Sequence, residues 1–211
     1  MLNFFKEVFK KGELRRKVVF TLGILFVFRL GAGIVIPYID TSAITSAATS
    51  SGIFGIMNML GGGTLEKFSL FSLGVSPYIT SSIIIELLSM DVVPALTQWN
   101  KEGNTGKKKK DKVTRVLTLA LAIIQGGSLT YAFDKGYSIL ASSSIWTYVY
   151  VVVVMAAGSM FTMWLGDQIT IKGVGNGTSL LIFTGIVANL PNSFISSFKS
   201  MVTFGSTYKT A

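Results

Sequence analysis

The sequence predicts an all-α membrane protein with five transmembrane helices. Half of its 211 residues are hydrophobic, only 14% are charged and the mean hydropathy is +0.58, whereas a soluble domain usually carries about 25% charged residues. Five apolar segments follow one another, most of them near the roughly 20 residues that a helix needs to cross the hydrocarbon core. Open strands are excluded there, because their backbone polar groups would lack partners in lipid.

Residues 1–17 form a basic, amphipathic segment in which Leu2, Phe5 and Phe9 recur at helical spacing between lysines. Two interpretations remain open: a basic flank before the first span, or a helix that lies in the membrane interface on anionic lipid. A cleaved signal peptide is not expected, because the apolar run that begins at Val18 is too long and no small-residue cleavage site ends it cleanly.

The five predicted spans are residues 18–37, 68–90, 116–133, 145–165 and 179–194. The fifth is the shortest, and Gly74 and Pro77 break the second. Proline removes a backbone hydrogen bond, and a broken helix at membrane depth is tolerated where it lines a cavity. The break in the second span therefore points to a pore or binding site, although kinks are also common in purely structural helices.

The connections differ in kind. Residues 38–67 are rich in Ser, Thr, Ala and Gly and contain one apolar stretch, 53–60, that is too short to span. Residues 91–115 are expected to project into the cytosol as a basic loop, because so polar a segment cannot bury itself. The other connections and the tail are residues 134–144, 166–178 and 195–211.

The basic residues predict the orientation. Fourteen of them lie in the N-terminal segment and in the connections after the second and fourth spans, and four lie on the other side. By the positive-inside rule the N-terminus is cytoplasmic, and five spans place the C-terminus outside.

Cysteine and histidine are absent from the sequence. Their absence excludes disulfides, Cys/His zinc or haem sites, thiol nucleophiles and Ser-His-Asp triads. No metal or cofactor is expected.

Two glycine-rich stretches, 173–177 and 103–107, look at first like nucleotide-binding loops. The first lacks the G-x-G-x-x-G spacing and follows a membrane helix, and the second has two residues between its glycines where a Walker A loop needs four. Neither is predicted to bind a nucleotide, and the first is predicted to be a tight turn in which glycine supplies positive φ.

Arg29 and Glu86 are the ionisable residues inside the predicted spans. Because a charge at the bilayer centre costs at least about 2.5–3.5 kcal/mol, neither should face lipid. Glu86 lies near the cytoplasmic end of its span, where it can either snorkel or line a polar path. Arg29 lies deeper in its span, which favours a buried partner.

Four ordered stretches carry a family resemblance: 28–31 with 36–40, 73–88, 101–103, and 166–170 with 173–183. In that order they resemble the first helix and its exit, the second helix, the first large cytoplasmic loop and the link between the fourth and fifth helices of the SecY family. The resemblance implies the N-terminal half of a ten-helix, inverted-repeat clamshell, with the C-terminal half missing.

The resemblance implies a protein-conducting channel for secretion across, and lateral insertion into, the bacterial cytoplasmic (inner) membrane. It also implies that the chain is not an enzyme, because partners supply the motor energy. The implied partners are the translocon subunits SecE and SecG, the SecA motor ATPase, the ribosome, signal peptides and nascent chains, and the missing half of the channel. Anionic lipid is a further expected partner of the basic N-terminal segment.

The resemblance also implies site residues. The pore ring is Val75, Ile79, Ile182 and Ile186, branched aliphatic residues that would form a dewetted seal around a moving chain. The plug is a short helix over 53–60 with Ile53, Phe54, Ile56, Met57, Asn58, Met59 and Leu60, and the lateral gate is Thr80, Ile84 and Leu87. The ribosome or motor would dock on Lys101, Lys107, Lys108, Lys109, Lys110 and Lys112. Ordinary helix packing of the ring residues and a pure topology signal from the lysines remain open alternatives.

Three positions depart from the family pattern: Glu86 stands where glutamine is usual, Ile171 where an acidic residue is usual, and Tyr38 where glycine is common.

A second hypothesis is one five-helix repeat of a secondary transporter, in which a broken helix binds a solute at the midplane. Aliphatic residues at the expected midplane, and the lack of a coupling carboxylate, favour the channel.

Overall fold

The computed structural model describes residues 12–40, 64, 67–90, 92–140 and 144–207. In these residues the chain forms six helices: α2 (Gly12–Ala32), α5 (Ser76–Leu88), α6 (Pro94–Lys101), α7 (Asn104–Tyr137), α8 (Ile145–Lys172) and α9 (Gly177–Thr207). The prediction of an all-helical protein is confirmed. By length and hydropathy α7 and α8 could each cross a membrane, whereas α5 and the first part of α9, Gly177–Ala188, are shorter apolar helices.

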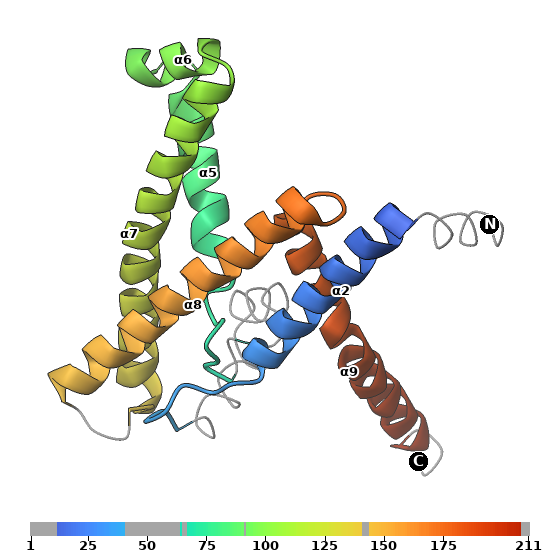
Figure 1. Cartoon of the computed structure of the whole chain (residues 1–211). Coiled ribbons are helices and arrows are strands. Elements are labelled where there is room, and N and C mark those ends of the chain that lie inside the picture. The colour runs from blue at the N-terminus through green and yellow to red at the C-terminus, as the bar shows by residue number, and fades with distance from the viewer. Residues whose placement is uncertain (1–11, 41–63, 65–66, 91, 141–143, 208–211) are drawn as a thin grey trace.

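The helices form an open, branched arrangement (Figure 1). The antiparallel helices α5 and α7 stand side by side, and α6 covers their upper end. Helix α8 runs obliquely from the lower end of α7 to α2 and α9, and it packs against both of them. The start of α2, the end of α5, the start of α7, the end of α8 and the start of α9 all lie toward the same, upper side of the view.

The first two predicted spans have other bounds as helices: α2 begins at Gly12 and has 21 residues, so it is shifted along the chain, and α5 is shorter, with 13 residues. Helix α2 ends at Ala32 and not at residue 37, because the residue before a proline disfavours helical angles and Pro37 follows closely. Helix α5 starts at Ser76 and not at residue 68, with Gly74 at φ 53 and Pro77 in its first turn. Glycine permits the left-handed angle, and proline is favoured where a helix begins.

The expectation of a basic loop over 91–115 is wrong for most of its length. Helix α6 and the first turns of α7 occupy it, joined by a turn in which Gly103 has φ 65. Lysine is a good helix former, so a polar segment can be fully helical without burying itself. The resulting helix α7 has 34 residues and ends in a left-handed cap at Ser138 with φ 50.

Helices also replace parts of the other predicted connections. Helix α8 continues beyond residue 165 to Lys172, and α9 continues through Pro191 to Thr207 instead of ending near residue 194. The first of these extensions places Asp167 on a helix that packs against α7 and α9.

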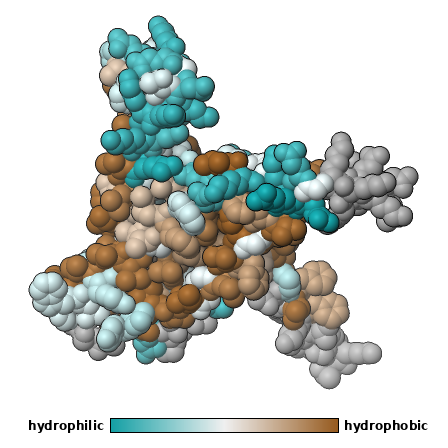
Figure 2. All heavy atoms as spheres, viewed as in Figure 1, coloured by the Kyte–Doolittle hydropathy of each residue, from teal (hydrophilic) through white to brown (hydrophobic). Residues whose placement is uncertain are grey.

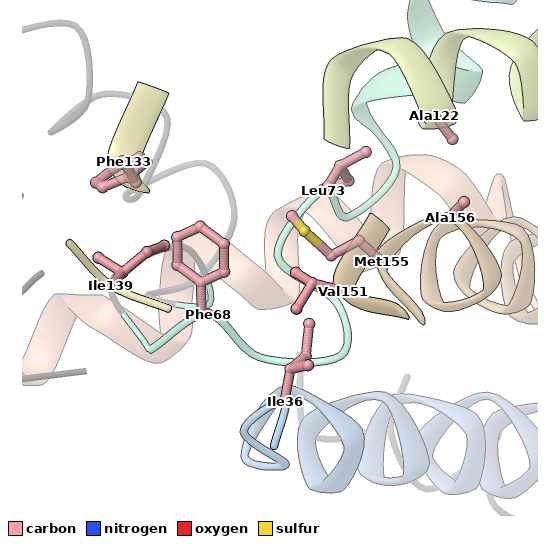
Figure 3. Close-up of a cluster of buried hydrophobic side chains, with 9 residues drawn as sticks. All are labelled: Ile36, Phe68, Leu73, Ala122, Phe133, Ile139, Val151, Met155 and Ala156. Carbon is pink, nitrogen blue, oxygen red and sulfur yellow. The ribbon is translucent and has the colours of Figure 1, made fainter. Parts of the chain in front are cut away.

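Two clusters of buried apolar side chains hold the helices together. The first joins α7 and α8 to the segments that follow α2 and precede α5, and Figure 3 shows its members: Ile36, Phe68, Leu73, Ala122, Phe133, Ile139, Val151, Met155 and Ala156. The Phe68 ring lies edge-on to Phe133 with centroids 5.4 Å apart. The second cluster joins α2, α8, α9 and the segment before α5: Phe28, Ala32, Phe71, Leu165, Ile169 and Leu181.

Apolar side chains also cover much of the outer surface. Figure 2 shows hydrophilic residues over α6, the adjoining end of α7 and the start of α2, with a broad hydrophobic zone below them. Large apolar side chains such as Phe26 and Val116 are each 65% exposed. An apolar surface of this extent is typical of a protein that contacts a membrane or another protein.

Candidate functional site

The four expected ring residues lie at the start of α5 and in the first part of α9, and all four are half-buried. Val75 is the residue before α5, and its carbonyl accepts a hydrogen bond of 3.0 Å from the Ile79 N–H. Val75 packs against the second cluster, to which α9 contributes Leu181, the neighbour of Ile182. Of the four ring residues Val75 thus contacts this cluster, while α5 packs mainly on α7 and α9 mainly on α8.

The backbone before α5 lies directly on α8. The Ser159 hydroxyl donates a hydrogen bond of 3.1 Å to the Gly74 carbonyl. A Cβ added at Gly158 would lie 1.8 Å from the Leu70 carbonyl oxygen. Small residues allow backbones to approach this closely in membrane proteins, so Gly158 and Ser159 bring α8 close to the segment that leads into α5.

The expected gate residues lie beside the buried stripe of α5. The stripe consists of Pro77, Ser81 and Ile85. Thr80 and Ile84 are half-buried and Leu87 is 57% exposed. The spacing of these three residues places them on one face of the helix, and that face becomes more exposed toward the end of α5.

The glycine-rich stretch after α8 is a packing turn, as predicted. Gly175 has φ 74, and a Cβ at Gly173 would lie 2.5 Å from the Thr21 hydroxyl oxygen of α2. That hydroxyl accepts a hydrogen bond of 3.1 Å from the Val174 N–H. A Cβ at Gly177 would lie 1.9 Å from the Gly166 carbonyl oxygen. The turn thus joins α2, α8 and α9 through close backbone contacts.

The six lysines expected to dock a partner are not equivalent. Lys101, Lys107, Lys108 and Lys112 are exposed. Lys109 forms an ion pair of 2.9 Å with Glu102, and its ammonium lies 6.0 Å from the centroid of the Trp99 ring. Lys110 is 18% exposed at its side chain and lies 3.3 Å from Glu86. Lys109 and Lys110 are therefore already bound to other residues of the helical hairpin that α5, α6 and α7 form.

The charged residues of the predicted spans lie near helix ends. Glu86 is exposed and paired with Lys110, which favours the snorkelling alternative over a polar path. Arg29 is exposed in the last turn of α2, and the expectation of a buried partner for it stays a prediction. A cation at that end of a helix interacts favourably with the helix dipole.

One ion pair was not anticipated from the sequence. Arg115 of α7 lies 2.8 Å from Asp167 of α8. The two residues are 52 positions apart, so no local spacing rule could have paired them. Their contact ties α8 to the end of α7 that carries the lysines.

Two other expectations fall outside the described residues: the plug at 53–60 and most of the N-terminal segment, 1–11. Among the described residues, no cluster of three or more acidic, histidine or cysteine side chains could hold a metal ion.

Comparisons with known proteins agree on one family. The SecY family profile matches residues 69–210. The chain is 43% identical over 204 residues to the protein translocase subunit SecY 1 of Lactobacillus kefiranofaciens, covering 96% of this chain and 47% of that protein. It is 42% identical over 195 residues to the protein translocase subunit SecY of Bacillus subtilis, covering 92% of this chain and 45% of that protein. The chain thus spans about half the length of these relatives.

The fold is also similar to that of solved structures. Sec61 in the canine ribosome-channel complex from the endoplasmic reticulum aligns with a TM-score of 0.57 at 17% identity, over 81% of this chain and 36% of that one. A structure described as a protein conducting channel aligns with the same values.

Proposed function

The chain belongs to the SecY family, and from this premise we propose that it supplies one half of a protein-conducting channel in the bacterial cytoplasmic membrane. The channel passes proteins across the membrane and releases hydrophobic segments sideways into lipid. The chain has no enzymatic role in this proposal, since partners supply the energy. The second half of the channel comes from a segment equivalent to the remainder of the longer relatives.

The observation that carries the proposal is the placement of aliphatic residues at the start of α5 and in α9. Val75, Ile79, Ile182 and Ile186 remain half-buried after the helices of this chain have packed, so part of each side chain is available to a facing half. Branched aliphatic side chains exclude water from a narrow constriction without binding the chain that passes.

In the proposed channel α2, α5, α7, α8 and α9 all cross the membrane, and residues 53–60 form a plug on the outer side. Two of these helices meet the length and hydropathy expected for a span by themselves. The others would cross as part of a bundle, where neighbouring helices satisfy the backbone of shorter or interrupted segments. Thr80, Ile84 and Leu87 of α5 line the lateral gate of this half.

The proposed partners are the ribosome, the SecA motor, SecE, SecG, signal peptides and nascent chains. The exposed lysines Lys101, Lys107, Lys108 and Lys112 are the docking surface, because a group of exposed cations attracts the phosphates of ribosomal RNA and acidic protein surfaces. The start of α2, with Arg15, Arg16 and Lys17, would contact anionic lipid headgroups. The transporter alternative gains no support from the family match.

Reporter fusions test the orientation. A reporter enzyme fused after Lys109 should be active in the cytoplasm, and one fused after Ser50 should be active outside. The reason is the excess of basic residues at the start of α2, the start of α7 and the end of α8, which lie on one side (Figure 1). Fusions after Ser138, between α7 and α8, serve as a second outer control. The reverse pattern would place the lysines outside and remove the basis for cytoplasmic docking.

A further inference from the structure

The Lys110 ammonium lies at the C-terminal end of α5, although Lys110 itself belongs to α7. Its Nζ is 3.3 Å from Glu86 Oε2, 3.3 Å from Ser89 Oγ and 3.1 Å from Asn100 Oδ1. An ammonium group has three donors, so these contacts use all of them. The side chain is only 18% exposed, which leaves little of it to reach a partner.

Ser89, the residue that caps α5, is held from both of the other helices in the hairpin. Its carbonyl accepts hydrogen bonds from Asn100 Nδ2 at 3.1 Å and from the Thr97 hydroxyl at 3.4 Å, both on α6. Its own hydroxyl donates to the Glu86 carbonyl at 2.8 Å and accepts from Lys110. The end of α5 is therefore fixed by α6 and α7 together.

Electrostatics favours this arrangement. A helix carries a partial negative charge at its C-terminus, and a cation there stabilises it. Helix α5 has no basic residue in its own last turn, and the Glu86 carboxylate adds a further negative charge to that turn. Lys110 supplies the missing positive charge from the neighbouring helix.

The neighbouring lysines have different surroundings. Lys107, Lys108 and Lys112 are exposed, and no ion pair joins any of them to another residue in the described part of the chain. Lys108 lies on the same helix as Lys110 and carries the same charge, so it is a matched control.

We propose that Lys110 is a positioning residue that fixes the end of α5, and that it is not one of the docking cations. The consequence for the channel rests on the proposed function, in which α5 lines the gate and the exposed lysines bind an anionic partner. A partner bound to Lys107, Lys108 and Lys112 contacts the helix that carries Lys110. Any movement of α7 that this binding causes is transmitted through Lys110 to Glu86 and Ser89, and so to α5.

Hydrogen exchange tests the positioning role. The full chain is placed in phospholipid vesicles as the unmodified protein, as Lys110→Met and as Lys108→Met. Methionine keeps the apolar stem and removes the charge. Exchange of the backbone amides over residues 86–93 should become about fivefold faster in Lys110→Met and should stay unchanged in Lys108→Met. Equal exchange in all three proteins would overturn the inference.

Swapping the two charged residues distinguishes the loss of the ion pair from a general structural defect. Lys110→Glu combined with Glu86→Lys should recover most of the lost protection, because a cation again lies on the last turn of α5. Glu86→Gln provides a second variant if Lys110→Met does not insert, with a smaller increase in exchange expected. If the swapped pair does not recover protection and Glu86→Gln does not raise the exchange rate, Lys110 contacts α5 through packing alone and not through its charge.

Binding measurements test the docking role separately. Ribosomes are titrated with the same vesicles at increasing salt concentration. Lys108→Met should weaken binding about threefold at low salt, and Lys110→Met should weaken it less. If Lys110→Met weakens binding as much as Lys108→Met and leaves exchange unchanged, Lys110 is a docking cation and the inference is wrong. If no lysine variant affects binding, the proposed docking surface is wrong, and the exchange result alone decides the role of Lys110.

Discussion

Replacing Ile79 and Ile186 with serine is expected to make the resting channel leak ions, with conductance rising on the order of tenfold. Both residues are half-buried within this half, and in the proposed channel each would present its remaining apolar surface to the constriction. Serine removes most of that surface and adds a hydroxyl that hydrogen-bonds water. The constriction then fills with water, and ions follow.

The leak is measured as conductance across planar bilayers that contain the complete channel, in the original and double-variant forms. A matched control replaces Val116, which is 65% exposed on α7 and would face lipid. The Val116→Ser channel should remain closed. If the Ile79/Ile186 variant and the control have the same low conductance, these isoleucines are ordinary packing residues.

Gly158→Ala is expected to lower the free energy of unfolding by about 3 kcal/mol, at the upper end of the range for overpacked sites. The new Cβ would lie 1.8 Å from the Leu70 carbonyl oxygen, which is backbone and cannot rotate away. Leu70 is itself held by a hydrogen bond of 2.8 Å from its N–H to the Ile34 carbonyl. Helix α8 must therefore move away from the segment that leads into α5.

The measurement is unfolding of the chain in mild-detergent micelles by titration with a denaturing detergent. Gly23→Ala in α2 is the control, because a Cβ at Gly23 meets nothing within 4 Å. Alanine in an open helix position should change stability by at most about 1 kcal/mol, in the stabilising direction. A similar effect of both substitutions would show that the close contact of α8 with Leu70 is not present in the protein.

Hydropathy was sufficient to predict where the apolar helices lie, but not where they end. It predicted a core region for every helix from α5 to α9 except the polar α6. The ends depend on single residues: Pro37 stops α2 early, and Gly74 with Pro77 delays α5. A window of apolar residues averages over these local signals.

The prediction of a loop over the basic segment, residues 91–115, was wrong for a different reason. The composition of the segment correctly predicts exposure, but exposure was taken to mean a loop. Lysine has a high helix propensity, and α7 begins at Asn104 within that segment. Periodicity could not reveal the start of this helix, because the face that packs on α5 and α6 carries Gly106, Lys110 and Thr114 and so has no apolar stripe.

One departure from the family pattern has a structural reason that the sequence alone does not reveal. Tyr38 stands where glycine is common, and its φ is 68. Positive φ is readily adopted by glycine and strained for other residues, so the family preference reflects the backbone of the turn after α2. The contacts of Lys110 with Glu86 and of Arg115 with Asp167 had no signal of this kind, because they join residues 24 and 52 positions apart.

The central claim, that a protein passes between the two halves beside α5 and α9, is tested most directly by crosslinking. A photoreactive residue is placed at Ile79 or Ile182, and in a control at Phe26, which is 65% exposed on α2. A secretory protein is then stalled in the complete channel and the membranes are illuminated. The account predicts crosslinks to the stalled chain from positions 79 and 182 and crosslinks to lipid from position 26. Crosslinks to the stalled chain from position 26, with none from positions 79 and 182, would contradict it.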